Sequence, residues 1–114
     1  MTAQDQLLID IRQDKGRAVL SLRGELDLAS APLLQAELDS SQIESASMLV
    51  LDLEELTFID STGLRVLLTA YEHSQGRGQE FAVTQGSPQV QRLLSITGVG
   101  EHLHIVAPGD ELLV

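Results

Sequence analysis

The sequence predicts an α/β fold in which helices pack on a single mixed β-sheet of four or five strands. Apolar and polar residues alternate over residues 7–12 and again over 18–23, the period of two half-buried strands joined as an N-terminal hairpin. Farther along, short apolar runs alternate with amphipathic segments, which predicts right-handed crossovers between parallel strands. With 114 residues, the chain is expected to form a single domain over residues 1–114.

Composition limits the partners that this chain can bind. Hydrophobic residues make up 43% and charged residues 21%, the balance of a folded protein. A net charge of −10 argues against nucleic acid and anionic membrane surfaces, and the 3% aromatic content leaves few rings for base stacking. Because no cysteine, signal peptide or membrane-length apolar run occurs, we expect a cytoplasmic protein that does not insert into a membrane.

Turn and cap residues place the first elements. A turn over residues 13–16 joins the two hairpin strands. The chain then leaves the sheet at residues 24–28, and a helix is expected over residues 31–39, with Ser30 as its N-cap and Pro32 in its first turn. The apolar stripe expected for this helix comprises Ala31, Leu34 and Leu38.

The middle of the chain predicts a central strand followed by a long helix. Residues 48–51 are all apolar, as in a strand covered on both faces, and this strand is expected to end at Leu53. Asp52, near the strand end, is interpreted as a hydrogen-bonding acid rather than a metal ligand. A loop then leads to a helix over residues 61–73. The buried face expected for that helix comprises Leu64, Leu67, Leu68 and Tyr71.

A strand and a helix are expected next. Residues 81–83 form the strand, Ser87 caps the helix, Pro88 opens it, and Gly98 ends it in a left-handed conformation. The buried stripe expected for this helix comprises Val90, Leu93, Leu94 and Thr97.

A last short strand is expected around Leu103 and Ile105. His102 and His104 would share one face of that strand, the spacing of a two-histidine metal pair. Because no third ligand is obvious, we interpret them as solvated or structural histidines and expect no metal site.

The most specific stretch is Phe58-Ile59-Asp60-Ser61-Thr62-Gly63-Leu64, at the start of the long helix. Carboxylate and hydroxyl oxygens accept hydrogen bonds from the unpaired N–H groups of a first helical turn, so Asp60 or Ser61 could be a plain cap. Ser61 also lies at the positive end of the helix dipole, where an anion is stabilised. Gly63 suits close approach by a partner or packing of the helix, and the sequence does not separate these two interpretations.

This stretch, together with Val50-Leu51-Asp52-Leu53, resembles the signature of the STAS domain in bacterial anti-sigma factor antagonists. The resemblance continues in Gly24-Glu25-Leu26-Asp27 and from Ser87 to Gly98. The same segments occur in the same order over most of the chain, which makes the resemblance to the family specific. It implies a STAS-like fold.

The resemblance also implies a phosphorylation switch. The serine that follows the aspartate, Ser61 here, would accept the phosphate, with Thr62 the weaker candidate. The unmodified protein would sequester an anti-sigma factor that is a serine kinase, this kinase would phosphorylate Ser61 and so eject the protein, and a serine phosphatase would reset it. ATP and Mg²⁺ would bind to the kinase, so no cofactor is expected on this chain.

The order of strands predicts where a partner docks. Asp27, Ser61 and Gly86 each follow a strand, and the carboxyl ends of parallel strands meet at one edge of a sheet. The residues predicted to bind the partner at this edge are Asp27, Asp60, Ser61, Thr62, Gly63, Arg65 and Gly86.

Two other functions are compatible with the sequence. A STAS scaffold subunit of a lipid-transport ATPase or of a stress-signalling assembly would need no phosphorylation switch, although the Asp60-Ser61-Thr62 context favours one. An enzyme would need Ser61 as a nucleophile, but its context is not a Gly-x-Ser-x-Gly elbow, and the chain has no Gly-x-x-x-x-Gly-Lys loop. We therefore expect a binding protein rather than an enzyme.

Overall fold

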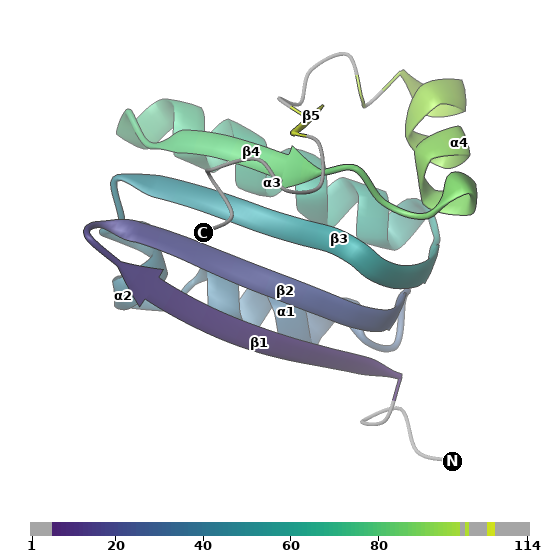
Figure 1. Cartoon of the computed structure of the whole chain (residues 1–114), viewed down its shortest axis with the longest axis horizontal. Helices are drawn as coiled ribbons and strands as arrows, with labels where there is room; N and C mark the ends of the chain where they lie inside the picture. Colours follow the sequence, from purple (N-terminus) through teal and green to yellow (C-terminus); the bar gives the residue numbers. More distant parts are fainter. Residues whose placement is uncertain (1–5, 99, 101–104, 107–114) are drawn as a thin grey trace.

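The computed structural model describes residues 6–98, 100 and 105–106. Within this part of the chain, one five-stranded sheet has the order β1-β2-β3-β4-β5, with β1 antiparallel to β2 and the other neighbours parallel (Figure 1). The mixed sheet with an N-terminal hairpin, predicted from the sequence, is thus confirmed. The strands are β1 (Leu7–Asp14), β2 (Arg17–Leu26), β3 (Met48–Ile59), β4 (Glu80–Thr84) and β5 (Ile105–Val106).

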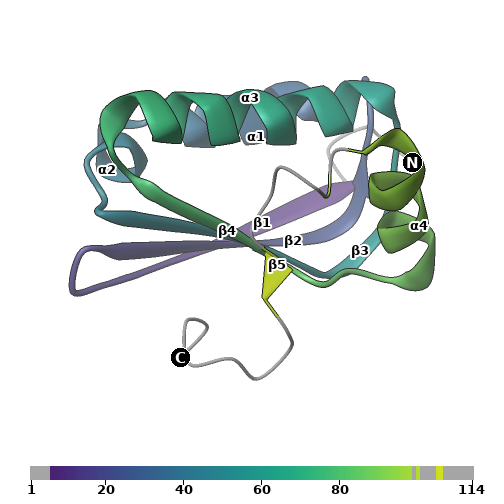
Figure 2. The same cartoon turned by 90° about the horizontal axis from the view of Figure 1, so that it is seen from above.

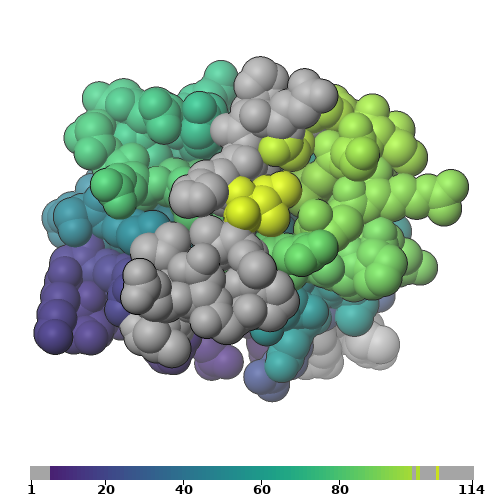
Figure 3. Space-filling model, turned by 45° about the horizontal axis from the view of Figure 1, so that its top comes forward, coloured from purple at the N-terminus to yellow at the C-terminus, as the bar shows by residue number. Residues whose placement is uncertain are grey.

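Three helices cover one face of the sheet, and a fourth lies at its end (Figure 2). The helices are α1 (Ala31–Leu38), α2 (Ser41–Glu44), α3 (Ser61–Arg77) and α4 (Pro88–Thr97). The first three pack against the sheet around a core that is aliphatic apart from Phe81, and α4, at one end of the molecule, adds Val90 and Leu94 to the same core (Figure 3). Among the helices of the described residues, none combines the length and the apolar character that would let it span a membrane.

The hairpin turn has the backbone that its sequence predicts. Lys15 and Gly16 have φ values of 53° and 82°, and they connect Asp14 to its cross-strand partner Arg17. Two successive left-handed residues match the right-handed twist of the flanking strands. The outer half of β1 lies away from the core, since residues 10–14 are exposed, so the half-buried pattern predicted for this strand holds only for its first residues.

The central strand is longer than predicted, because β3 continues through residues 54–59, which were expected to be a loop. These residues pair in parallel with the end of β2, and Leu26 pairs with Ile59. Register shifts between residues 21 and 25 of β2 break the alternation of buried and exposed side chains. The sequence in this region therefore does not have the pattern of a strand.

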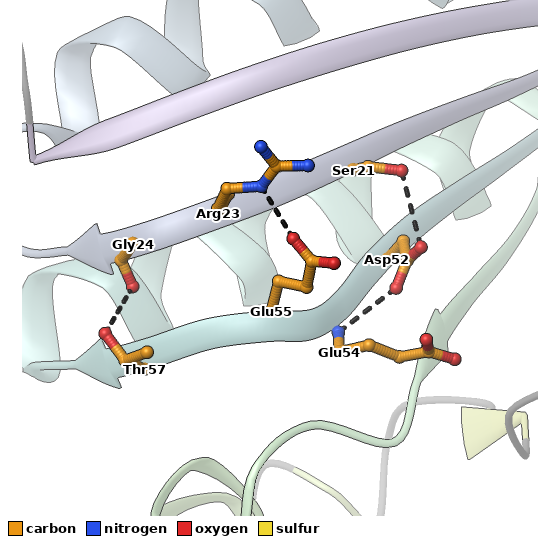
Figure 4. A network of polar contacts seen from close by, with 7 residues as sticks. All are labelled: Ser21, Arg23, Gly24, Asp52, Glu54, Glu55 and Thr57. Carbon is orange, nitrogen blue, oxygen red and sulfur yellow. Dashed lines mark hydrogen bonds and ion pairs between the residues drawn. The ribbon is translucent and has the colours of Figure 1, made fainter.

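Side chains bridge the two strands across these shifts (Figure 4). Arg23 Nε lies 2.6 Å from Glu55 Oε2, and Thr57 Oγ1 donates to the Gly24 carbonyl at 3.0 Å. The Arg23–Glu55 pair is mostly exposed, so its contribution to the free energy of unfolding is small. The pair therefore marks where the two irregular strands meet rather than a major source of stability.

Asp52 has the hydrogen-bonding role that the sequence predicts, but it lies within β3 rather than near its end. Its carboxylate accepts hydrogen bonds from Ser21 Oγ at 3.3 Å and Thr84 Oγ1 at 3.0 Å. Thr84 Oγ1 in turn accepts the Leu53 N–H at 2.7 Å. Asp52 therefore ties β2, β3 and β4 together at the point where β4 ends.

Most helix boundaries agree with the prediction, but Ser30 does not cap α1. Its hydroxyl makes no capping bond to the helix and instead donates to the Glu25 carbonyl at 2.8 Å. The predicted buried stripe of α1 is confirmed. At α4, Ser87 accepts the Val90 N–H as predicted, and Gly98 is left-handed, with φ 77°.

Two predicted buried faces differ from the structure. α3 continues to Arg77 instead of ending at His73, and Leu68 and Tyr71 are only half-buried because Ala70 and Ser74 take the positions that face the core. In α4, Leu93 is only half-buried and Thr97 is exposed, and the Thr97 hydroxyl donates to the Leu93 carbonyl at 2.8 Å. The predictions for Leu103, His102 and His104 lie outside the described residues.

Candidate docking site at the start of helix α3

Asp60 joins the end of β3 to α3. Its Oδ1 accepts the Gly63 N–H at 2.9 Å, which satisfies one of the unpaired donors of the first helical turn. Its Oδ2 accepts the Leu28 N–H at 3.1 Å, and its own N–H donates to the Leu26 carbonyl at 3.2 Å. One carboxylate thus holds the loop after β2 against the start of α3.

Replacing Asp60 with alanine should lower the free energy of unfolding by about 2 kcal/mol, because the helix loses its cap and the Leu28 N–H loses its acceptor. Chemical denaturation of the purified variant measures this change. The control is Asp39→Ala at the end of α1, where the exposed carboxylate accepts a side-chain bond from Gln35 and makes no other side-chain bond to the described residues. The control should change the free energy of unfolding by less than about 0.5 kcal/mol. Equal effects of both substitutions would contradict the joining role of Asp60.

Ser61 is the first residue of α3, and its side chain is exposed. Because Asp60 caps the helix, the Ser61 hydroxyl is not needed for that purpose. An exposed hydroxyl at a helix N-terminus is accessible to a kinase, and a phosphate placed there would be stabilised by the helix dipole. Asp60 therefore caps the helix, and the Ser61 hydroxyl stays exposed to solvent, as a serine that a kinase modifies must be.

The residues that follow Ser61 differ in accessibility. Thr62 is half-buried, and Arg65 is exposed one turn farther along α3. Gly63 is buried: a Cβ atom there would lie 2.8 Å from each of Leu26 Cγ, the Leu26 carbonyl oxygen and Ile59 Cγ1. The space beside Gly63 is filled by this chain's own strands. Packing of the helix, rather than close approach by a partner, therefore explains the glycine.

The loop that contains Asp27 lies beside Asp60 as predicted, but the loop that contains Gly86 does not reach it. Asp27 Oδ1 accepts the N–H groups of Ala29 and Ser30, at 3.0 and 3.1 Å, and so shapes the loop that Asp60 holds. Gly86 lies against the Leu53 carbonyl and Val90 instead. Because β4 ends beside the middle of β3, the Gly86 loop falls short of Asp60.

The matched STAS domain model covers residues 9–109. The chain belongs to the STAS domain family. A protein named anti-sigma F factor antagonist from Paenibacillus polymyxa is 34% identical to this STAS domain over 94 residues, which are 82% of this chain and 80% of the relative. An anti-sigma-B factor antagonist from Listeria monocytogenes is 31% identical over 85% of this chain and 86% of its own length.

A solved structure extends the likeness to three dimensions. The crystal structure of an anti-sigma factor antagonist from Mycobacterium paratuberculosis matches this STAS domain with a TM-score of 0.85 and 28% identity, covering 99% of this chain and 96% of that one. The family resemblance inferred from the motif around Ser61 is therefore confirmed.

Exposed apolar side chains flank the site on this STAS domain, and the sequence analysis missed them. Leu28, the loop residue whose N–H Asp60 accepts, has a side chain that is 74% exposed, and Phe58 is 46% exposed at the end of β3. Phe58 lines a hollow of about 260 Å³ with Leu93 and Ile96 of α4, and Ile96 is 70% exposed. The available signal was the run of apolar residues before Asp60, but its assignment to a loop concealed which of them face solvent.

Proposed function

We propose that this STAS domain is an anti-sigma factor antagonist that acts by binding and not by catalysis. Unmodified Ser61 lets it sequester an anti-sigma factor that is a serine kinase, and phosphorylation of Ser61 releases that partner. The observation that carries the proposal is the exposed Ser61 hydroxyl at the start of a helix that Asp60 already caps. The names of the relatives at 31–34% identity support the same role.

The switch follows from the charge that phosphate adds. A phosphoserine carries roughly −1.5 to −2 charges. The N-terminus of α3 stabilises that charge, so the modified protein keeps its fold. A docked partner must instead remove the phosphate, and the Asp60 carboxylate next to it, from water, which is costly unless new cationic partners are available. The modification therefore weakens binding without a change of fold.

The proposed docking surface combines this polar corner with the apolar residues beside it. The Leu28 N–H donates to Asp60, and Phe58, two residues before Asp60, lines a hollow with Ile96. The apolar side chains supply the area that a partner buries, whereas the phosphorylation state of the exposed hydroxyl determines the affinity of the complex. Asp27 shapes this corner, and Arg65 presents a cation one helical turn away.

Phosphopeptide mapping tests the proposal. Incubation with the anti-sigma factor kinase of the source organism, ATP and Mg²⁺ should place one phosphate on Ser61, and Ser61→Ala should abolish it. Thr62→Ala is the matched control, because Thr62 is the neighbouring hydroxyl but is half-buried, and this variant should be phosphorylated like the wild type. Phosphate that persists on Ser61→Ala would contradict Ser61 as the acceptor. A serine phosphatase should restore binding to the modified protein.

A further inference from the structure

β1 forms an outer edge of the sheet within the described part of the chain (Figure 1). It is eight residues long, and residues 10–14 are exposed. Two large apolar side chains lie on it with much of their surface in solvent, Leu8 at 54% and Ile11 at 41% exposed. A long edge strand with exposed apolar residues is a template for pairing with another strand.

The backbone groups that face this edge can be identified. The Glu25 N–H donates to the Gln6 carbonyl, and the two-residue turn makes Asp14 and Arg17 a closely paired couple, so the even-numbered residues of β1 bond to β2. Because backbone groups alternate between the two sides of a strand, the N–H and C=O groups of Ile9, Ile11 and Gln13 point toward the free edge.

Side-chain charge and the length of the paired stretch together favour one register for pairing with a second copy. When two antiparallel copies of β1 are centred on Ile11, the paired stretch covers residues 8–14 and places Asp10 of each copy opposite Arg12 of the other. Ile11 then faces Ile11, and the outward backbone groups of Ile9 and Gln13 meet. Centring on residue 10 would oppose two aspartates, and centring on residue 12 would oppose two arginines. Opposite charges across a strand pair are stabilising and like charges are destabilising.

We propose that this chain forms a symmetric dimer through β1, centred on Ile11, which joins two sheets into one. The twofold axis lies perpendicular to the sheet, so the helices of both copies lie on the same face. Ser61 follows the far end of β3, two strands in from this edge, and remains accessible in both copies. The dimer is independent of the proposed phosphorylation switch, and either can fail without the other.

The net charge of −10 on each copy opposes association, so the dimer forms best where salt screens that repulsion. At about 0.15 M salt the Debye length is about 8 Å, which screens distant charges but not the Asp10–Arg12 contacts. An interface of one strand pair is small, which places the dimer among the weak, concentration-dependent associations. The measurement must therefore extend to high protein concentration.

Sedimentation equilibrium tests the proposal. It is measured over a range of protein concentrations for the wild type and for variants in which the charges of residues 10 and 12 are reversed. The wild-type mass should rise from one chain toward two as the concentration increases. Asp10→Arg and Arg12→Asp should each raise the dissociation constant at least about tenfold, because each creates two like-charge pairs. The double variant Asp10→Arg with Arg12→Asp restores opposite charges and should return to within about threefold of the wild type.

Both substituted positions are exposed, so circular dichroism and the Tm should show that all variants remain folded. A wild-type chain that stays monomeric at every concentration would overturn the proposal, even if β1 binds a strand of another protein. A wild-type dimer that the double variant fails to restore would overturn the Ile11-centred register.

Discussion

Replacing Ser61 with aspartate should weaken the complex with the anti-sigma factor about a hundredfold, a loss of roughly 3 kcal/mol of binding free energy. The added carboxylate stands beside Asp60 on an exposed corner, and a docked partner would have to bury both charges together. Isothermal titration calorimetry with the purified anti-sigma factor measures the change. The Tm of the variant should be unchanged or slightly higher, because a negative charge suits the first turn of α3.

Ser41→Asp is the matched control. Ser41 is likewise the exposed first residue of a helix, α2, and α2 lies at the opposite end of the sheet from the start of α3 (Figure 2). The control adds the same charge to the same total of −10, so it isolates position from net charge. It should bind the anti-sigma factor like the wild type. If Ser61→Asp binds equally well, the electrostatic switch is wrong; if both variants lose affinity, the effect comes from net charge.

The order of elements was predictable because local signals agreed with the fold. The hairpin turn, the Ser87-Pro88 helix start and the left-handed Gly98 each depend on residues close in sequence, and each occurs in the structure as predicted. The extension of β3 to Ile59 was not predictable in this way, because its hydrogen-bond partners lie on β2, about thirty residues earlier, and its register shifts hide the alternation. Ser30 fails as a cap for a different, local reason, because its hydroxyl donates to the Glu25 carbonyl and the Asp27 carboxylate in the preceding loop.

The residues of the candidate site that form a continuous motif could be predicted from the sequence, whereas those that join the site through tertiary contacts could not. Asp60 and Ser61 were found from the motif, and the structure divides capping and exposure between them. The bond from the Leu28 N–H to Asp60 and the hollow between Phe58 and α4 depend on segments distant in sequence. No periodicity within one segment reports such contacts. Exposed apolar residues beside a motif become visible only when the fold places them.

Gly63→Ala should be the most destabilising of the substitutions considered, lowering the free energy of unfolding by about 3 kcal/mol. A methyl group at this position would lie 2.8 Å from the Leu26 carbonyl oxygen and from atoms close to the backbone in the Leu26 and Ile59 side chains. None of these is the end of a flexible side chain, so α3 must shift away from the strand ends. The shift would also disturb the Asp60 cap, which bonds to the Gly63 N–H.

Gly76→Ala provides the control on the same helix, because its Cβ would meet no described atom within 4 Å apart from its chain neighbours and the adjacent backbone of its own helix. Alanine is favoured over glycine in a helix, so this variant should gain about 0.5–1 kcal/mol in the free energy of unfolding. Chemical denaturation of both variants should show that the free energy of unfolding falls for Gly63→Ala and rises for Gly76→Ala. If Gly63→Ala were as stable as the wild type but failed to bind the anti-sigma factor, the glycine would serve partner approach and not packing. A loss of stability confined to Gly63→Ala would show that α3, and with it Ser61, is positioned by its contact with the ends of β2 and β3.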